Sequence, residues 1–224
     1  MAKTVADGGK PPSRITTNYL TRAIGPVKYT WGAAEEQDEI GVATGVARTA
    51  VGGDVLSVEV SVVDGKGDLT LTGSLGDVMK ESAQAALSYA RARSHSFKLP
   101  PKVFEENNIH IHVPSGAVPK DGPSAGVTLA TALVSALGRL PVRKDVAMTG
   151  EVTLRGRVLE VGGIKEKVLA AHRAGIKTFV LPKKNNRDLE DVPSQVRRTL
   201  NFVPVENMDE VLAVALLPAM RAEG

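Results

Sequence analysis

"KDGPSAGVTLATALVSALG" spans Lys120–Gly138 and places one hydroxyl group ahead of an apolar segment. The stretch opens on Asp121, Gly122 and Pro123, a combination that favours a turn, and no charged side chain follows Ser124. A helix that is apolar around its whole circumference is buried in a protein core. The pattern therefore predicts a buried helix with Ser124 at its beginning.

A serine near the start of a helix is most often an N-cap. Here Pro123 prefers the first helical position, which leaves Gly122 or Asp121 as the cap and puts Ser124 inside the first turn. The residue three positions on is Val127 rather than Glu or Gln, so no capping box forms. Ser124 is therefore not needed as a cap, and another role has to be considered.

The composition is that of a globular domain. The chain has 224 residues, of which 42% are hydrophobic and 24% charged, enough for one sizeable core. It contains no cysteine, which excludes disulfides, thiolate metal sites and a cysteine nucleophile. No run of about 18 apolar residues and no P-loop motif occur. The net charge of +3 is too small to support binding to DNA.

Alternating and helical periodicities predict an α+β domain with antiparallel or mixed sheets packed against helices. Residues 40–49, 54–63 and 68–73 are expected to pair as an antiparallel meander, with a turn at Asp64–Gly67. Further strands are expected at residues 107–113, 145–150, 157–163, 177–182 and 201–205. Helices are expected at residues 74–93, 163–175, 186–192, 194–200 and 207–217.

A nucleophilic role for Ser124 is chemically plausible, because free N–H groups in a first helical turn can stabilise an oxyanion. Such a serine needs a base. His110 and His112 lie on one face of the strand predicted at 107–113 and could form a Ser-His-Asp set with Asp121. A polar strand face is the commoner explanation for such a pair. The same spacing could begin a metal site, but no third ligand stands out.

Lysine is the second kind of base that the sequence offers. On a helical wheel of residues 163–175, Lys167 falls among alanines, whereas Lys165 falls on a more mixed flank. Burial lowers the pKa of a lysine by up to ~3–5 units, which would leave a usable neutral fraction at pH 7. A lysine whose amine reaches water is the commoner arrangement. A third interpretation needs no base, because a Gly-rich turn before a helix can bind phosphate.

Three long stretches resemble the proteolytic domain of the Lon protease family. They are "TGSLGDVMKESAQAAL" (Thr72–Leu87), "PKDGPSAG" (Pro119–Gly126) and "VAMTGEVTLRGRVLEVGGIKEKVLAAHRAGIKTFVLP" (Val146–Pro182). The resemblance implies a Lon-type peptidase domain, similar to ribosomal protein S5 domain 2, over residues 15–217. Residues 1–14 are then expected to be a flexible linker and residues 218–224 a C-terminal tail.

The resemblance also implies a set of site residues. Ser124 matches the nucleophile, Lys167 the general base, and Thr149 the threonine that orients the lysine amine. Backbone N–H groups of Gly122 and Ala125 are expected to stabilise the oxyanion, and no metal is expected. The resemblance implies supporting roles for five polar residues around the site: Glu59, His110, His112, Asp121 and Glu151.

The implied activity is that of a serine endopeptidase that cleaves unfolded or misfolded polypeptides. In this family an ATPase module delivers the substrate, and neither that module nor its ATP and Mg²⁺ sites occur in this sequence. The resemblance further implies a homo-hexamer in the full-length protein, no membrane partner and a cytoplasmic location. The alternatives are a non-catalytic scaffold module of the same fold and a kinase-like phosphate-binding domain.

Overall fold

The computed structural model describes residues 6–10, 13–25, 35–49, 52–114 and 120–218 of the chain. It divides the chain into two compact units, residues 1–30 and 31–224. The first unit contains helix α2 (Thr17–Ile24), whose N-cap Thr16 accepts a hydrogen bond from Tyr19 N at 3.2 Å. The linker predicted at 1–14 is only partly covered by these ranges, and the tail predicted at 218–224 lies outside them beyond residue 218.

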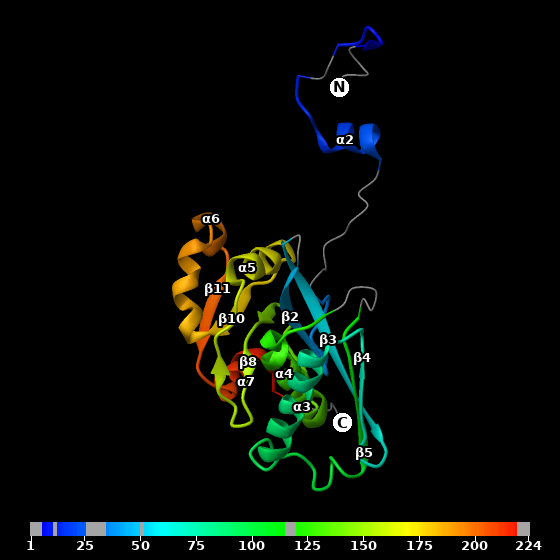
Figure 1. Cartoon of the computed structure of the whole chain (residues 1–224), viewed down its shortest axis with the longest axis vertical. Coiled ribbons are helices and arrows are strands. Elements are labelled where there is room, and N and C mark those ends of the chain that lie inside the picture. The colour runs from blue at the N-terminus through cyan, green and yellow to red at the C-terminus, as the bar shows by residue number, and fades with distance from the viewer. Residues whose placement is uncertain (1–5, 11–12, 26–34, 50–51, 115–119, 219–224) are drawn as a thin grey trace. The chain divides into compact units, whose positions relative to one another are not determined.

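A seven-stranded mixed sheet forms the centre of the second unit (Figure 1). Its order is β11-β10-β7-β2-β3-β5-β4. The strands are β2 (Val42–Thr49), β3 (Gly52–Asp64), β4 (Leu69–Thr72), β5 (Asn107–His112), β7 (Val146–Met148), β10 (Thr178–Pro182) and β11 (Asn201–Val205). The pairs β2–β3 and β3–β5 are antiparallel, and the other four pairs are parallel. The predicted α+β fold with a mixed sheet is therefore confirmed.

The predicted antiparallel meander is wrong in its third strand. Strand β4 does not return along β3, because β5 lies between them and pairs in parallel with β4. The reason lies at the end of β3, where Gly65 N donates to Glu106 O at 2.9 Å. The side-chain oxygen of Asn108 then accepts from Lys66 N at 2.8 Å and Asp68 N at 3.0 Å. These bonds fasten the loop to the start of β5, so no tight hairpin forms.

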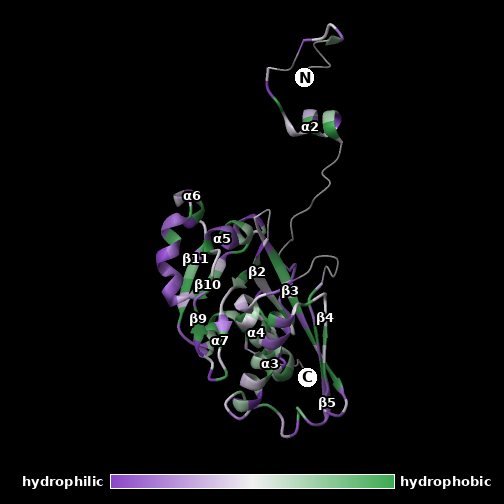
Figure 2. Ribbon diagram, in the orientation of Figure 1, coloured by the Kyte–Doolittle hydropathy of each residue, from purple (hydrophilic) through white to green (hydrophobic). Residues whose placement is uncertain are grey.

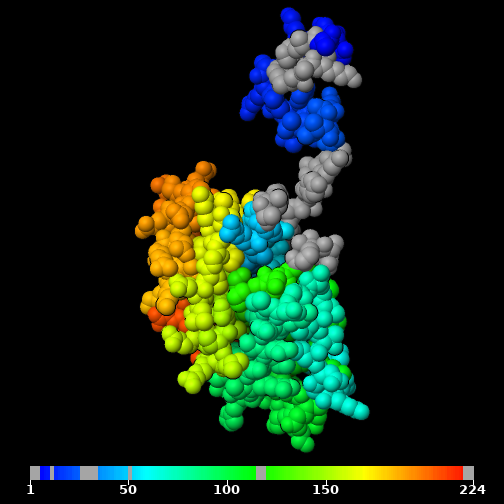
Figure 3. Space-filling view, in the orientation of Figure 1, coloured from blue at the N-terminus to red at the C-terminus, as the bar shows by residue number. Residues whose placement is uncertain are grey.

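Two pairs of short strands stand apart from the main sheet. Strand β1 (Glu39–Ile40) pairs with β6 (Pro141–Val142), and β8 (Glu151–Val152) pairs with β9 (Val158–Leu159). Figure 3 shows the yellow-green residues that follow β7 between the orange residues near 185–200 and the blue-green residues of 77–92. A bond from Val158 N to Glu206 O at 2.9 Å ties β9 to the C-terminal part.

Two hydrophobic cores cover opposite faces of the sheet. Neighbouring residues in a strand point to opposite faces, and Met148 belongs to one core while Ala147 belongs to the other. The first core packs α3 (Asp77–Ala92), α4 (Gly126–Gly138) and α7 (Met208–Ala215). The second packs α5 (Ile164–Arg173), together with the turns η2 (Lys183–Asp191) and α6 (Ser194–Arg197).

Helix α4 is the centre of the first core, as its sequence predicts. Eleven of its residues are buried, and in the colouring of Figure 2 it carries no strongly hydrophilic residue. A short 3₁₀ turn, η1 (Pro123–Ala125), leads directly into it. Any group on that turn is therefore attached to a rigid element that the core holds on all sides.

Helix α5 lies so close to β3 that there is no room for a side chain at Gly53, where the two elements touch. A Cβ atom added to Gly53 would overlap the backbone carbonyl of Glu166. Because backbone atoms cannot move aside as a flexible side chain can, glycine is required here for steric reasons. This contact sets the distance of α5 from the sheet.

We expect Gly53→Ala to destabilise the chain by about 1–3 kcal/mol, because the added methyl group must push α5 away from β3. Urea unfolding followed by circular dichroism measures the change. Gly162→Ala is the matched control, since a Cβ atom at Gly162 meets nothing within 4 Å. Equal unfolding midpoints for the two variants would contradict the close contact.

Candidate active site

Ser124 lies in the first turn, as predicted. The N-cap of η1 is Gly122, with φ 127°, and it makes no side-chain capping bond. Such a φ value is strained for any residue with a Cβ atom, so the turn requires glycine at this position. Ser124 is half-buried and lines a hollow of about 370 Å³. We call this the serine hollow; Arg48, Met79, Asp121, Gly122 and Ala125 also line it.

Lys167 is buried on α5, and the helical-wheel prediction that separates it from Lys165 is confirmed. Only 2% of Lys167 is exposed, whereas Lys165 is exposed. Burial lowers the pKa of the Lys167 ammonium to about 8, because the charged form loses its hydration. The amine Nζ donates a hydrogen bond to Thr149 Oγ1 at 3.1 Å.

Thr149 joins Lys167 to the serine turn. Its hydroxyl donates to the backbone carbonyl of Ser124 at 3.2 Å, and Gly150 N donates to the same carbonyl at 2.9 Å. Thr149 follows β7 directly and is fully buried. The structure thus brings Ser124, Thr149 and Lys167 together from three separate elements, η1, the end of β7 and α5.

Asp121 caps a helix. Its Oδ1 atom accepts from Met79 N, in the first turn of α3, at 3.0 Å and from Gly122 N at 2.9 Å. The N–H of Gly122 is one of the two donors expected to stabilise an oxyanion, and here it is bound to Asp121. It would have to leave Asp121 before it could bind a substrate.

The two histidines lie on one face of β5, as predicted, but in a different hollow from Ser124. His110 Nε2 and His112 Nδ1 lie 2.8 and 2.7 Å from the hydroxyl of Thr72. We call their hollow, of about 540 Å³, the histidine hollow; its lining also includes the carboxylates of Glu35, Glu39 and Glu59. Glu59 is exposed and pairs across the sheet with His112.

The backbones of the remaining predicted residues, Glu151 and Ala125, lie in or near the serine turn. Glu151 is half-buried at the start of β8, directly after Gly150, and pairs with Leu159. Ala125 is buried at the end of η1. Sequence reasoning assigned no role to Thr72, Met79 or Gly150, although all three occur in the stretches that resemble the Lon family. Their contacts join elements far apart in the chain, and no local pattern indicates such contacts.

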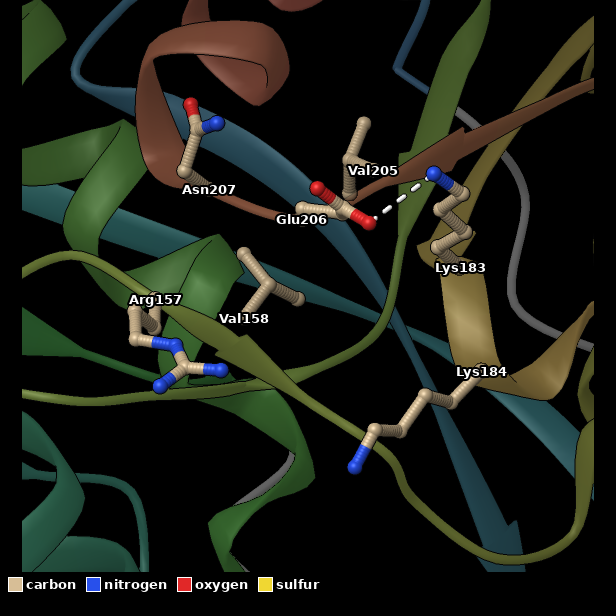
Figure 4. Close-up of a pocket in the computed structure, with 7 residues that line it drawn as sticks. All are labelled: Arg157, Val158, Lys183, Lys184, Val205, Glu206 and Asn207. Carbon is tan, nitrogen blue, oxygen red and sulfur yellow. Dashed lines mark ion pairs between the residues drawn. The ribbon is translucent and has the colours of Figure 1, made fainter.

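A third hollow, of about 540 Å³, is lined by Arg157, Val158, Lys183, Lys184, Val205, Glu206 and Asn207 (Figure 4). Lys183 Nζ pairs with Glu206 at 2.9 Å, and both side chains are largely exposed. An ion pair so exposed to water contributes little free energy. Because this hollow contains no nucleophile or buried base, we do not place the active site there.

Across the part of the chain that the structure describes, no group of three or more His, Asp or Glu side chains is arranged to hold a metal ion. Among the helices that the structure describes, none is long and apolar enough to cross a membrane.

We expect Lys167→Met to stabilise the chain at pH 7. Folding lowers the pKa of this lysine from 10.5 to about 8, so the unfolded chain binds the proton more tightly. The shift of 10.5 − 8 = 2.5 units corresponds to a penalty of about 3 kcal/mol, partly offset by the bond to Thr149. Below pH 8 the free energy of unfolding is lowered by this full amount, and the loss disappears as the pH rises to 10.5.

Urea unfolding at pH 7 and pH 9.5 measures this effect. The variant should exceed the wild type in stability by about 1–3 kcal/mol at pH 7 and by less at pH 9.5. Lys165→Met, on the same helix, is the control and should change stability by less than about 0.5 kcal/mol. A loss of stability at pH 7 in Lys167→Met would mean that the amine is not desolvated.

The chain matches known proteins along most of its length. The family model described as the Lon protease (S16) C-terminal proteolytic domain matches residues 14–218. The chain is 62% identical over 215 residues to "Lon protease" of Chloroflexus aggregans and 58% identical over 215 residues to "Lon protease" of Brevibacillus choshinensis. Each match covers 96% of this chain but 26% and 28% of the relative. The chain therefore spans about a quarter of the length of the curated relatives it matches.

These matches confirm the resemblance that the sequence motifs indicate. The family model covers almost the whole second unit, including every element of the serine hollow and the buried lysine. From this match and from the identity to its relatives, we conclude that the chain belongs to the Lon protease family and corresponds to its C-terminal proteolytic domain.

Proposed function

We propose that this domain is a serine endopeptidase in which Ser124 is the nucleophile and Lys167 the general base. The observation that carries the proposal is the buried amine of Lys167, hydrogen-bonded to Thr149, whose hydroxyl binds the carbonyl of Ser124. A base must be neutral, and the pKa of about 8 leaves roughly one lysine in ten neutral at pH 7. With the ordinary value of 10.5, the neutral fraction would be roughly one in three thousand.

The proposed reaction follows the chemistry of serine acyl transfer. Neutral Lys167 removes the proton of Ser124, and the Ser124 oxygen attacks a peptide carbonyl. Backbone N–H groups of the turn at Gly122–Ala125 stabilise the oxyanion, with that of Gly122 released from Asp121. The lysine then gives its proton to the leaving amine, and water hydrolyses the acyl-enzyme.

The proposed substrates are unfolded or misfolded polypeptides. Relatives named Lon protease are between three and four times as long as this chain, which supports the presence of further modules in the full-length protein. We propose that an ATPase module, with its own ATP and Mg²⁺, delivers substrate to a hexameric ring of such domains in the cytoplasm. The likeness to ribosomal protein S5 domain 2 stays a prediction within this proposal, as do the supporting roles of Glu59, His110, His112 and Glu151.

Ser124→Ala should abolish cleavage of a fluorogenic unfolded protein, because no other nucleophile is proposed. Ser96→Ala, at an exposed serine, is the control and should cleave at the wild-type rate. Cleavage by Ser124→Ala at the wild-type rate would exclude Ser124 as the nucleophile. If both the wild type and Ser96→Ala are inactive, ATP-γ-S in a thermal shift assay tests the kinase-like alternative, which predicts stabilisation. An unchanged melting temperature would mean that cleavage requires the ring or the ATPase module.

The pH dependence of kcat should show an acid limb near pH 8. Activity should rise with pH through this value, because the deprotonated form of Lys167 is the active base. Initial rates between pH 6 and pH 9.5 at saturating substrate give the profile. A plateau already reached at pH 6 would point to a carboxylate or to a base with a much lower pKa.

A further inference from the structure

The backbone just before the nucleophile is fastened to the segment just before α3. Gly76 N donates to Lys120 O at 2.8 Å, and Lys120 N donates to Ser74 O at 3.1 Å. Leu75 and Lys120 form a parallel β-bridge between the same two segments. This pairing ends at Lys120, three residues before Pro123, where the turn that carries Ser124 begins.

Asp121 extends this connection from the backbone to a side chain. Helix α3 begins after Gly76, which has no side chain to cap the free N–H groups of the first turn. The carboxylate of Asp121 replaces the missing cap by accepting from Met79 N, and the same oxygen accepts from Gly122 N. One carboxylate oxygen therefore joins the start of α3 to the residue that caps the serine turn.

Glycine at position 76 leaves the space that Asp121 occupies. A Cβ atom at Gly76 would overlap the carboxylate and the Cβ atom of Asp121. The φ value of Gly76 is −71°, which any residue can adopt, so the requirement for glycine is steric. The missing side chain at position 76 and the cap from position 121 are therefore two parts of one contact.

We propose that Asp121 and Gly76 are a positioning pair that fixes the serine turn on helix α3. The inference rests on the proposed function, because it assigns these residues to the placement of Ser124. Asp121 acts on the turn through its bond to Met79 N, which can persist when Gly122 N is released to the oxyanion, so its hydrogen-bonding oxygen matters more than its charge. Since a shift of about 1 Å at a reacting group can cost about a hundredfold in rate, loss of this anchor should lower kcat.

Steady-state cleavage of an unfolded protein tests the proposal with four variants. Asp121→Ala and Gly76→Ala should each lower kcat about 10- to 100-fold, with KM changed by less than about threefold. Asp121→Asn should keep kcat within about threefold of the wild type, because its amide oxygen can still accept from Met79 N. The double variant Gly76→Ala/Asp121→Ala should be no slower than the slower single variant, since both changes break one contact.

Asn207→Ala is the matched control for loss of a helix cap. Asn207 caps α7, where its Oδ1 atom accepts from Glu210 N at 3.1 Å, and the residue belongs to neither the serine hollow nor the dyad. This variant should lower the melting temperature about as much as Asp121→Ala, because each removes one N-cap. Its kcat should stay at the wild-type value, which separates positioning from general loss of stability.

Hydrogen exchange tests the same contact without any turnover. In Asp121→Ala and in Gly76→Ala, amide exchange should accelerate both at residues 76–80 and at residues 120–126, while Asn207→Ala should leave both segments unchanged. An inactive wild-type chain would concern the proposed function or its need for the ATPase module, and exchange would still decide the contact. Unchanged exchange, additive effects in the double variant, or a kcat that is unchanged or raised in Asp121→Ala would overturn the positioning role.

Discussion

The hydrogen bond from the buried amine of Lys167 to Thr149 is the interaction on which the site depends. A buried ammonium group is costly unless it finds a partner, and a lowered pKa reduces this cost by favouring the neutral amine. The same desolvation that opposes folding also produces a base that is usable near neutral pH. Stability and proposed chemistry are therefore linked through one side chain.

The end of β7 explains how two separate cores contribute to one site. Helices α4 and α5 pack on opposite faces of the sheet, each within its own core. Thr149 and Gly150 follow β7 directly, where Thr149 binds Lys167 of α5 and Gly150 N binds the carbonyl of Ser124. The strand end thus joins an element from each face, and the close contact of Gly53 with α5 holds the lysine at its distance from the sheet.

Several polar residues that the family resemblance groups around the site have structural contacts of their own. Asp121 caps α3, while His110 and His112 share the hydroxyl of Thr72 in a different hollow. The segment Thr72–Met79 is common to both arrangements, because it begins at the histidine contact and ends at the aspartate contact. This gives a physical reason for a motif that carries no nucleophile or base.

Local sequence patterns were enough to predict those features that depend on residues close together in the chain. Pro123 placed Ser124 in the first turn, the apolar run after it predicted the buried α4, and helical periodicity separated Lys167 from Lys165. Three features became visible only in the folded chain: the insertion of β5 between β3 and β4, the cap that Asp121 supplies to α3, and the link through Thr149. Periodicity reports which face of an element is apolar, whereas these contacts join residues far apart in the chain and depend on how the completed sheet brings their ends together.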